Sequence, residues 1–133
     1  MKLEEINIKL PAKPEYMSVA RLTTAAIANR MGFTIDDIED LKVAVSEACS
    51  FLIRQFSDIT NLTIDYQIDT NADIHVTIAS SDADVVNREE SRESELSLFI
   101  MESVADKVTK VVDNGVIRGF SILKTGGNSL EHE

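Results

Sequence analysis

The chain has 133 residues, 44% of them hydrophobic and 27% charged, a composition typical of one folded globular domain and unlike that of disordered chains. Its formal net charge of −10 disfavours direct binding to nucleic acid or to an anionic membrane, because such binding depends on clustered lysine and arginine. No apolar run is long enough to span a membrane, and the acidic N-terminal residues are not typical of a secretion signal, so we expect a cytoplasmic protein.

The first third of the chain predicts a strand and a helix. Residues 4–10 alternate apolar and polar side chains, as half-buried strands do, and Pro11 ends the pattern. Pro14 suits the first turn of a helix, and Gly32 suits its C-terminal end. We assign the apolar positions of this helix to Val19, Leu22, Thr23, Ala26, Ile27 and Met31.

A second helix is predicted from Thr34, which is a suitable N-cap, to about Ser57. Its apolar residues recur at steps of three and four, as on a helix that packs against a sheet. They are Ile38, Leu41, Val45, Cys49, Leu52 and Phe56. The lone cysteine falls within this stripe, so we expect it to be buried rather than reactive.

The remainder of the chain predicts two hairpins separated by a loop and a helix. Residues 62–68 and 74–78 alternate on either side of a polar turn, and residues 80–95 are charged and without periodicity, as in a surface loop. A short amphipathic helix follows, with apolar positions Leu96, Phe99, Ile100 and Val104. The pair Asn114-Gly115 between two apolar segments is a strong signal for a closing hairpin.

These elements predict an α+β fold in the order β-α-α-β-β-α-β-β. We expect a two-layer sandwich, in which helices cover one face of a mixed, mostly antiparallel sheet. We assign residues 1–124 to a single domain and residues 125–133 to a disordered tail, in which Leu-Glu-His resembles a cloning remnant.

Residues 39–50, EDLKVAVSEACS, are similar to the N-box helix of anti-sigma-factor serine kinases, a family of the GHKL (histidine-kinase-like) ATPase superfamily. The resemblance extends over nearly the whole chain, through residues 14–16, 21–23, 30–34, 98–103 and 114–116. It implies a Bergerat-type ATP-binding fold, ATP and Mg²⁺ as cofactors, a sigma factor and an antagonist protein as partners, and a homodimer.

The N-box itself departs from the family at one position. Glu47 matches the family's general base, which acts on a serine of the antagonist. One turn later, the family has the asparagine that binds Mg²⁺, and this chain has Phe51. Since Mg²⁺ requires oxygen ligands, the phenyl ring removes the expected link between metal and phosphate.

Two further nucleotide-binding motifs of the family are also altered. Ser80 and Asp82 stand where the D-x-G motif has its adenine-binding aspartate and its glycine. Glu95 and Ser97 stand among the glycines of the family's phosphate-binding lid end, and Glu95 adds negative charge there. We therefore expect no cofactor, although weak ATP binding without Mg²⁺ stays open.

Each singled-out residue also has a plainer interpretation. Glu47 suits a solvated helix surface, Phe51 suits the core, and Arg21 matches a family arginine that touches partners but is equally typical of an exposed helix. The two histidines have no second ligand nearby in sequence, so we expect no metal site.

The sequence thus favours a partner-switching regulator that resembles an anti-sigma factor, binds a sigma factor or an anti-sigma antagonist, and lacks kinase activity. Two alternatives remain open. One is an ATP-dependent serine protein kinase that phosphorylates an antagonist, and the other is a small-ligand sensor with a cavity around Phe51.

Overall fold

We describe the chain from a computed structural model, which defines residues 4–56, 59–80 and 92–126. The predicted order of elements is confirmed. In sequence, they are β1 (Glu4–Pro11), a 3-10 turn (Pro14–Tyr16), α1 (Met17–Arg30), α2 (Ile35–Gln55), β2 (Asn61–Ile68), β3 (Ile74–Ser80), α3 (Arg92–Val104), β4 (Lys107–Asp113) and β5 (Val116–Lys124).

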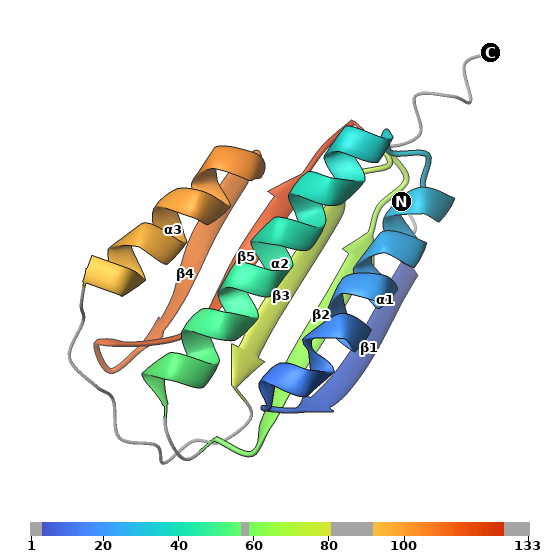
Figure 1. Cartoon of the computed structure of the whole chain (residues 1–133). Coiled ribbons are helices and arrows are strands. Elements are labelled where there is room, and N and C mark those ends of the chain that lie inside the picture. The colour runs from blue at the N-terminus through green and yellow to red at the C-terminus, as the bar shows by residue number, and fades with distance from the viewer. Residues whose placement is uncertain (1–3, 57–58, 81–91, 127–133) are drawn as a thin grey trace.

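The strands form one five-stranded sheet in the order β1-β2-β3-β5-β4, and the three helices lie side by side on one of its faces (Figure 1). This confirms the predicted α+β sandwich. All four strand pairings are antiparallel, so the sheet has no parallel pair among the described strands. The free edges belong to β1 and β4.

The predicted closing hairpin joins β4 to β5. Asn114 and Gly115 both have positive φ angles, 54° and 76°, as the favoured two-residue hairpin turn requires. Asn and Gly are the residues that adopt this conformation at least cost, and this explains why the pair was such a clear signal in the sequence.

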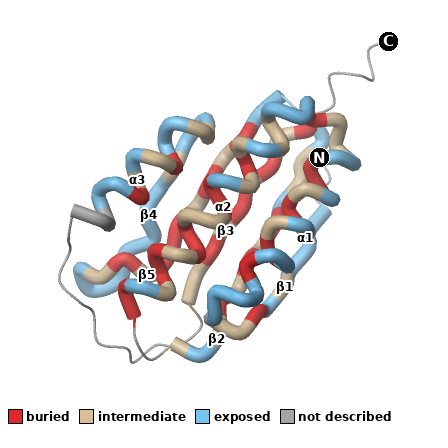
Figure 2. Tube along the Cα trace, in the orientation of Figure 1, coloured by how far each residue is buried: buried red, intermediate tan, exposed pale blue. Residues whose placement is uncertain are grey.

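The predicted face of α2 is the centre of the core. Its buried residues run along the side that faces the sheet, as the red segments of Figure 2 show. Thr34 caps the helix as predicted, because its hydroxyl accepts a hydrogen bond from the Asp37 backbone N–H at 3.1 Å. Among the described residues, no helix has both the length and the hydropathy needed to span a membrane.

The predicted apolar face of α1 was right at Ile27, which is buried, and at Met31, which packs against the core, but wrong at other positions. Leu22 is 68% exposed and Val19 is exposed too, whereas the buried residues are Met17, Ala20, Thr24, Ile27 and Ala28. Three of these side chains, Ala20, Thr24 and Ala28, are small. The polar one, Thr24, can be buried because its hydroxyl has hydrogen-bond partners. The Thr24 hydroxyl donates to the Ala20 carbonyl oxygen at 2.8 Å and lies 2.7 Å from the Tyr66 hydroxyl.

The apolar positions assigned to α3 need a similar correction. Leu96 and Phe99 are exposed, whereas Ser97 and Met101 are buried against the core. The helix also begins at Arg92, inside the segment predicted as a loop. Residues 81–91 of that loop lie outside the described residues.

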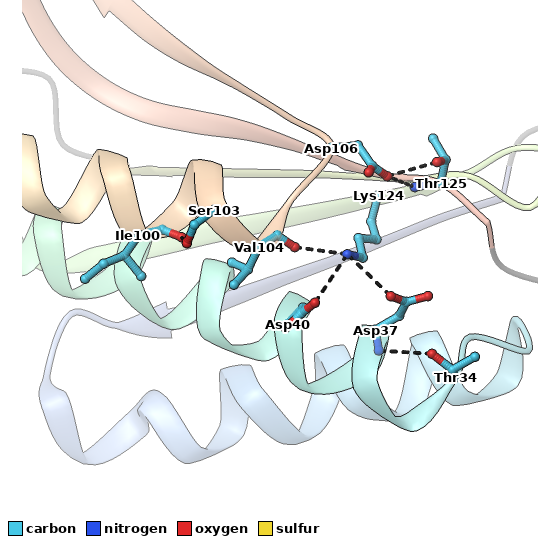
Figure 3. Close-up of polar contacts among 9 residues, drawn as sticks. All are labelled: Thr34, Asp37, Asp40, Ile100, Ser103, Val104, Asp106, Lys124 and Thr125. Atoms are coloured by element: carbon cyan, nitrogen blue, oxygen red, sulfur yellow. Dashed lines mark hydrogen bonds and ion pairs between the residues drawn. The ribbon is translucent and has the colours of Figure 1, made fainter.

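The C-terminal end of α3 is fixed by a buried lysine. Lys124 of β5 donates to the Val104 carbonyl oxygen at 3.0 Å, and its ammonium group lies 3.5 Å from Asp37 and 3.7 Å from Asp40 of α2 (Figure 3). One side chain thus joins β5 to both helices at the same end of the molecule.

Thr125, which we predicted to begin a disordered tail, is held beside this lysine. Its backbone N–H and hydroxyl both donate to the Asp106 carboxylate, at 2.6 and 2.9 Å. These bonds, the backbone one first, lower the pKa of Asp106. Residues 127–133 of the predicted tail lie outside the described residues.

Candidate functional site

The candidate site lies where the C-terminal half of α2 faces the N-terminal half of α3 (Figure 1). Glu47, Phe51 and Arg54 follow one another on α2 at steps of four and three residues, so they share one side of the helix. The end of β3 leads into this region, which is why the residues of separate sequence motifs meet here.

Phe51 belongs to the core rather than to an open cavity. Its side chain is 3% exposed, and its ring meets that of Phe120 on β5 edge to face, with centroids 5.1 Å apart and planes at 85°. This is a favoured geometry for two aromatic rings. The space next to α2 at this position is therefore filled by two phenyl groups.

Glu47 is half-buried and lies at the border of two open pockets. One, of about 400 Å³, lies on the side of α2 that faces α1 and is lined by Arg21, Glu39, Lys42, Val43 and Ser46 as well. The other, of about 280 Å³, lies between α2 and α3, where Arg54, Leu96, Ser97 and Ile100 complete its lining. The Glu47 carboxylate can therefore be approached from either side of the helix.

A hydrogen bond joins α2 to α3 across the smaller pocket. The Arg54 guanidinium donates to the hydroxyl of the buried Ser97 at 2.8 Å. Ser97 is among the site residues predicted from the sequence, whereas Arg54 is not. Its position seven residues after Glu47, two helical turns along the same face, was the signal that could have found it.

The remaining altered positions lie at the edge of this region. The Ser80 hydroxyl, at the end of β3, is buried and has no hydrogen-bond partner among the described residues. Glu95 is exposed on the first described turn of α3, so its carboxylate is directed to solvent rather than into the pocket. Asp82 lies outside the described residues.

Arg21 is half-buried on α1 and faces the larger pocket. On the α2 side of that pocket, the ammonium of Lys42 lies 3.0 Å from the Glu39 carboxylate. The structure therefore brings Arg21 and Glu47 to one pocket, although they are far apart in the sequence. Phe51, Ser80 and Ser97 lie outside it.

Two titratable groups are buried beneath the helices. Burial raises the pKa of Cys49 to about 12, against a smaller opposing effect of the Arg21 charge. It also raises the pKa of Tyr66 to about 12, in spite of the hydrogen bond between the Tyr66 and Thr24 hydroxyl groups. Both groups are therefore neutral at physiological pH, and the thiol is not a nucleophile there.

Nothing in the described ranges has the arrangement of a metal centre. No group of three or more histidine, cysteine, aspartate or glutamate side chains gathers there. His75 lies on β3 with its Nε2 atom 3.9 Å from the Asp69 carboxylate. His132 lies outside the described residues.

Comparison with known proteins identifies the fold family. Residues 10–118 match the histidine kinase-like ATPase domain. The serine-protein kinase RsbW of Bacillus mycoides is 49% identical over 65 residues, which are 47% of this chain and 41% of that protein. RsbW of Bacillus thuringiensis is 55% identical over 53 residues, 40% of this chain and 33% of that protein. The matches thus span less than half the length of these relatives.

A solved structure supports the same fold. The RsbU and RsbW domains of a Mycobacterium tuberculosis protein superpose with a TM-score of 0.66 and 13% identity, over 93% of this chain and 32% of that one. At this identity, the likeness concerns the fold alone. Together with the match over residues 10–118, it confirms the resemblance drawn from the N-box, and the chain belongs to the histidine kinase-like ATPase domain family.

Proposed function

We propose that this protein is a partner-switching regulator of the anti-sigma-factor type, which binds a sigma factor or an antagonist protein and does not transfer phosphate. The observation that carries this proposal is the burial of Phe51 against Phe120. The chain has the fold of the family, but a phenyl ring stands at the position where the family binds Mg²⁺. The RsbW relatives supply the functional class.

The described residues do not fit Mg²⁺-ATP as the family binds it. Phe51 has no oxygen to offer the metal, and the Ser80 hydroxyl replaces the carboxylate expected to bind adenine. The Ser97 hydroxyl accepts the Arg54 hydrogen bond, which joins α3 to α2 beside the pocket that Glu47 lines. Lys124 joins the C-terminal end of α3 to α2.

The partner surface in this proposal is the pocket between α1 and α2. Arg21 and Glu47 both line it, and the exposed Leu22 lies next to Arg21 along α1. Arginine is enriched in binding hot spots, and the exposed leucine beside it adds apolar area to this surface. The proposal also includes a homodimer, which rests on the family resemblance alone and which sedimentation of the purified protein tests.

Kinase activity is the second candidate, and the accessibility of Glu47 favours it. The carboxylate borders two open pockets and could accept a proton from a bound hydroxyl group. A base of this kind acts only when a phosphoryl donor is bound close to it. For this reason, the filled position at Phe51 weighs against the kinase.

The test is binding and phosphate transfer with purified sigma factors and anti-sigma antagonists from the source organism. We expect one of them to bind without any transfer of labelled γ-phosphate, and Arg21→Ala to weaken binding about tenfold. Arg30→Ala is the matched control, because Arg30 is an exposed arginine on α1 that lines a different pocket, with Glu4 and Asp69. Transfer that is lost in Glu47→Ala would establish the kinase instead.

A further inference from the structure

The outer face of α3 carries two large apolar side chains in solvent. Phe99 is 66% exposed and Leu96 is 57% exposed, and both lie on the same side of the helix at a step of three residues. Ile100 is half-buried next to them and, together with Leu96, lines the pocket between α2 and α3. We call Leu96, Phe99 and Ile100 the α3 patch.

Folding of the described residues does not account for this patch. α3 already packs on the core through Ser97 and Met101, which are both buried, and it is held by Arg54 near its middle and by Lys124 at its C-terminal end. Replacing the two exposed residues with polar ones would leave these contacts in place. Contiguous apolar side chains in water are typical of a surface that another molecule covers.

The described charged residues of α3 next to the patch are acidic. Glu95 and Glu102 are exposed on α3 and flank the patch from the preceding and the following turn. Residues 95–104 contain no basic side chain, and the adjoining pocket adds Glu47. The only guanidinium in that pocket's lining, that of Arg54, donates to Ser97. An occupant with lysine or arginine beside its apolar side chains would complement these charges.

We propose that the α3 patch binds a positively charged amphipathic helix of a partner protein. In helix-in-groove recognition, an amphipathic helix lays its apolar face against an apolar surface, and Leu96, Phe99 and Ile100 form such a surface on α3. The partner's lysine or arginine side chains pair with Glu95 and Glu102. The site is distinct from the pocket around Arg21, and it rests on the proposed function only in that the partner is a protein.

The probe is a synthetic amphipathic helix of leucine and lysine, with a counterpart that carries glutamate in place of lysine. Fluorescence anisotropy with the full chain gives the affinity, and amide chemical shifts locate the bound peptide. We expect the lysine peptide to bind with its largest shifts on α3, and the glutamate peptide not to bind. Shifts centred on another element would overturn the proposal, as would equal binding of both peptides.

Matched variants separate the patch from the overall negative charge. We expect Leu96→Ala with Phe99→Ala to weaken binding of the lysine peptide about tenfold, whereas Ile35→Ala, at a 78% exposed site on α2, has no effect. We expect Glu95→Gln with Glu102→Gln to weaken it more than Glu4→Gln with Glu5→Gln, which removes the same charge from exposed positions of β1. If either α3 variant and its control changed the affinity for the lysine peptide equally, the proposal would be overturned.

Two further outcomes bear on the identity of the occupant. If the purified protein self-associates and Phe99→Ala abolishes that association, a second copy of the chain covers the patch and the proposal is wrong. Loss of sigma-factor or antagonist binding in Arg21→Ala with unchanged binding of the lysine peptide would support two separate surfaces. Binding of the synthetic peptide does not require a sigma factor or an antagonist. Absence of peptide binding would therefore contradict the α3 site alone, and absence of sigma-factor and antagonist binding would contradict the proposed function alone.

Discussion

Phe51 and Glu47 are one helical turn apart on α2, yet their surroundings differ completely. The phenyl ring is enclosed with Phe120, whereas the carboxylate borders two open pockets. An asparagine at position 51 would need hydrogen bonds to water, or a bound metal, for its amide group. The apolar surroundings of Phe51 do not supply such partners. At this position, therefore, an aromatic core and a Mg²⁺ site exclude each other.

The buried hydroxyl of Tyr66 gives a prediction about alkaline pH. Its folded pKa is raised from 10.0 to about 12, so above pH 10 the unfolded state loses a proton that the folded state keeps. The stabilisation is fully present below pH 10 and is lost as the pH rises to about 12. We expect the free energy of unfolding to fall across this window, and less steeply in Tyr66→Phe.

Urea unfolding at a series of pH values measures this slope. Each group of this kind changes the free energy of unfolding by at most about 1.4 kcal/mol per pH unit. Cys49, whose pKa is raised from 9.0 to about 12 by burial, adds to the fall in both proteins. Tyr16→Phe, at an exposed tyrosine, is the control and should leave the slope unchanged. A slope in Tyr66→Phe equal to that of the original chain would contradict this account.

Among the elements, the pairing of β3 with β5 depends on one glycine. A Cβ atom at Gly119 would collide with the Ile78 carbonyl oxygen and meet the Ala79 Cα at 3.0 Å. Backbone atoms cannot give way without separating the two central strands. At Gly115, by contrast, a Cβ atom meets nothing within 4 Å, and only the positive φ of 76° is unfavourable.

We therefore expect Gly119→Ala to destabilise the fold by more than about 3 kcal/mol and Gly115→Ala by about 1 kcal/mol. Thermal unfolding followed by circular dichroism compares the two variants. Equal losses of stability, or a larger loss at Gly115, would show that the central strands accommodate a side chain here.

The elements themselves could be predicted from the sequence, because each carried a local signal. Alternation marked the strands, Thr34 marked the start of α2, and Asn114-Gly115 marked the last turn. The buried sides of α1 and α3 could not be predicted, because each helix has apolar residues on two sides and tertiary packing selects one. Thr24 and Ser97 illustrate the difficulty, since partners remote in sequence, Tyr66 and Arg54, make their burial acceptable.

The candidate site was predicted in part for the same reason. The resemblance placed Glu47 and Phe51 on one helix, and the fold then brought Arg21 to the pocket that Glu47 lines. The spacing of Arg54 from Glu47 places both on one face of α2, but the hydrogen bond of Arg54 to Ser97 depends on the position of α3 and could not be predicted from that spacing. The predicted lack of a cofactor stays a prediction, because it concerns a binding equilibrium.

At the scale of the whole molecule, the three helices form a layer with two separate candidate surfaces. The pocket between α1 and α2 contains Arg21, and the α3 patch is apolar with an acidic border. The net charge of −10 favours basic partners in general. Between the two surfaces, contacts of Arg54 and Lys124 hold α3 against α2.

A calorimetric titration of the purified chain with ATP, with and without Mg²⁺, measures directly whether the chain binds the nucleotide. We predict no saturable heat and no rise in melting temperature at millimolar ATP, because Phe51 fills the metal position and α3 is tied to α2. Saturable, Mg²⁺-dependent binding at micromolar ATP would contradict this claim and would make the protein kinase the better account of its function.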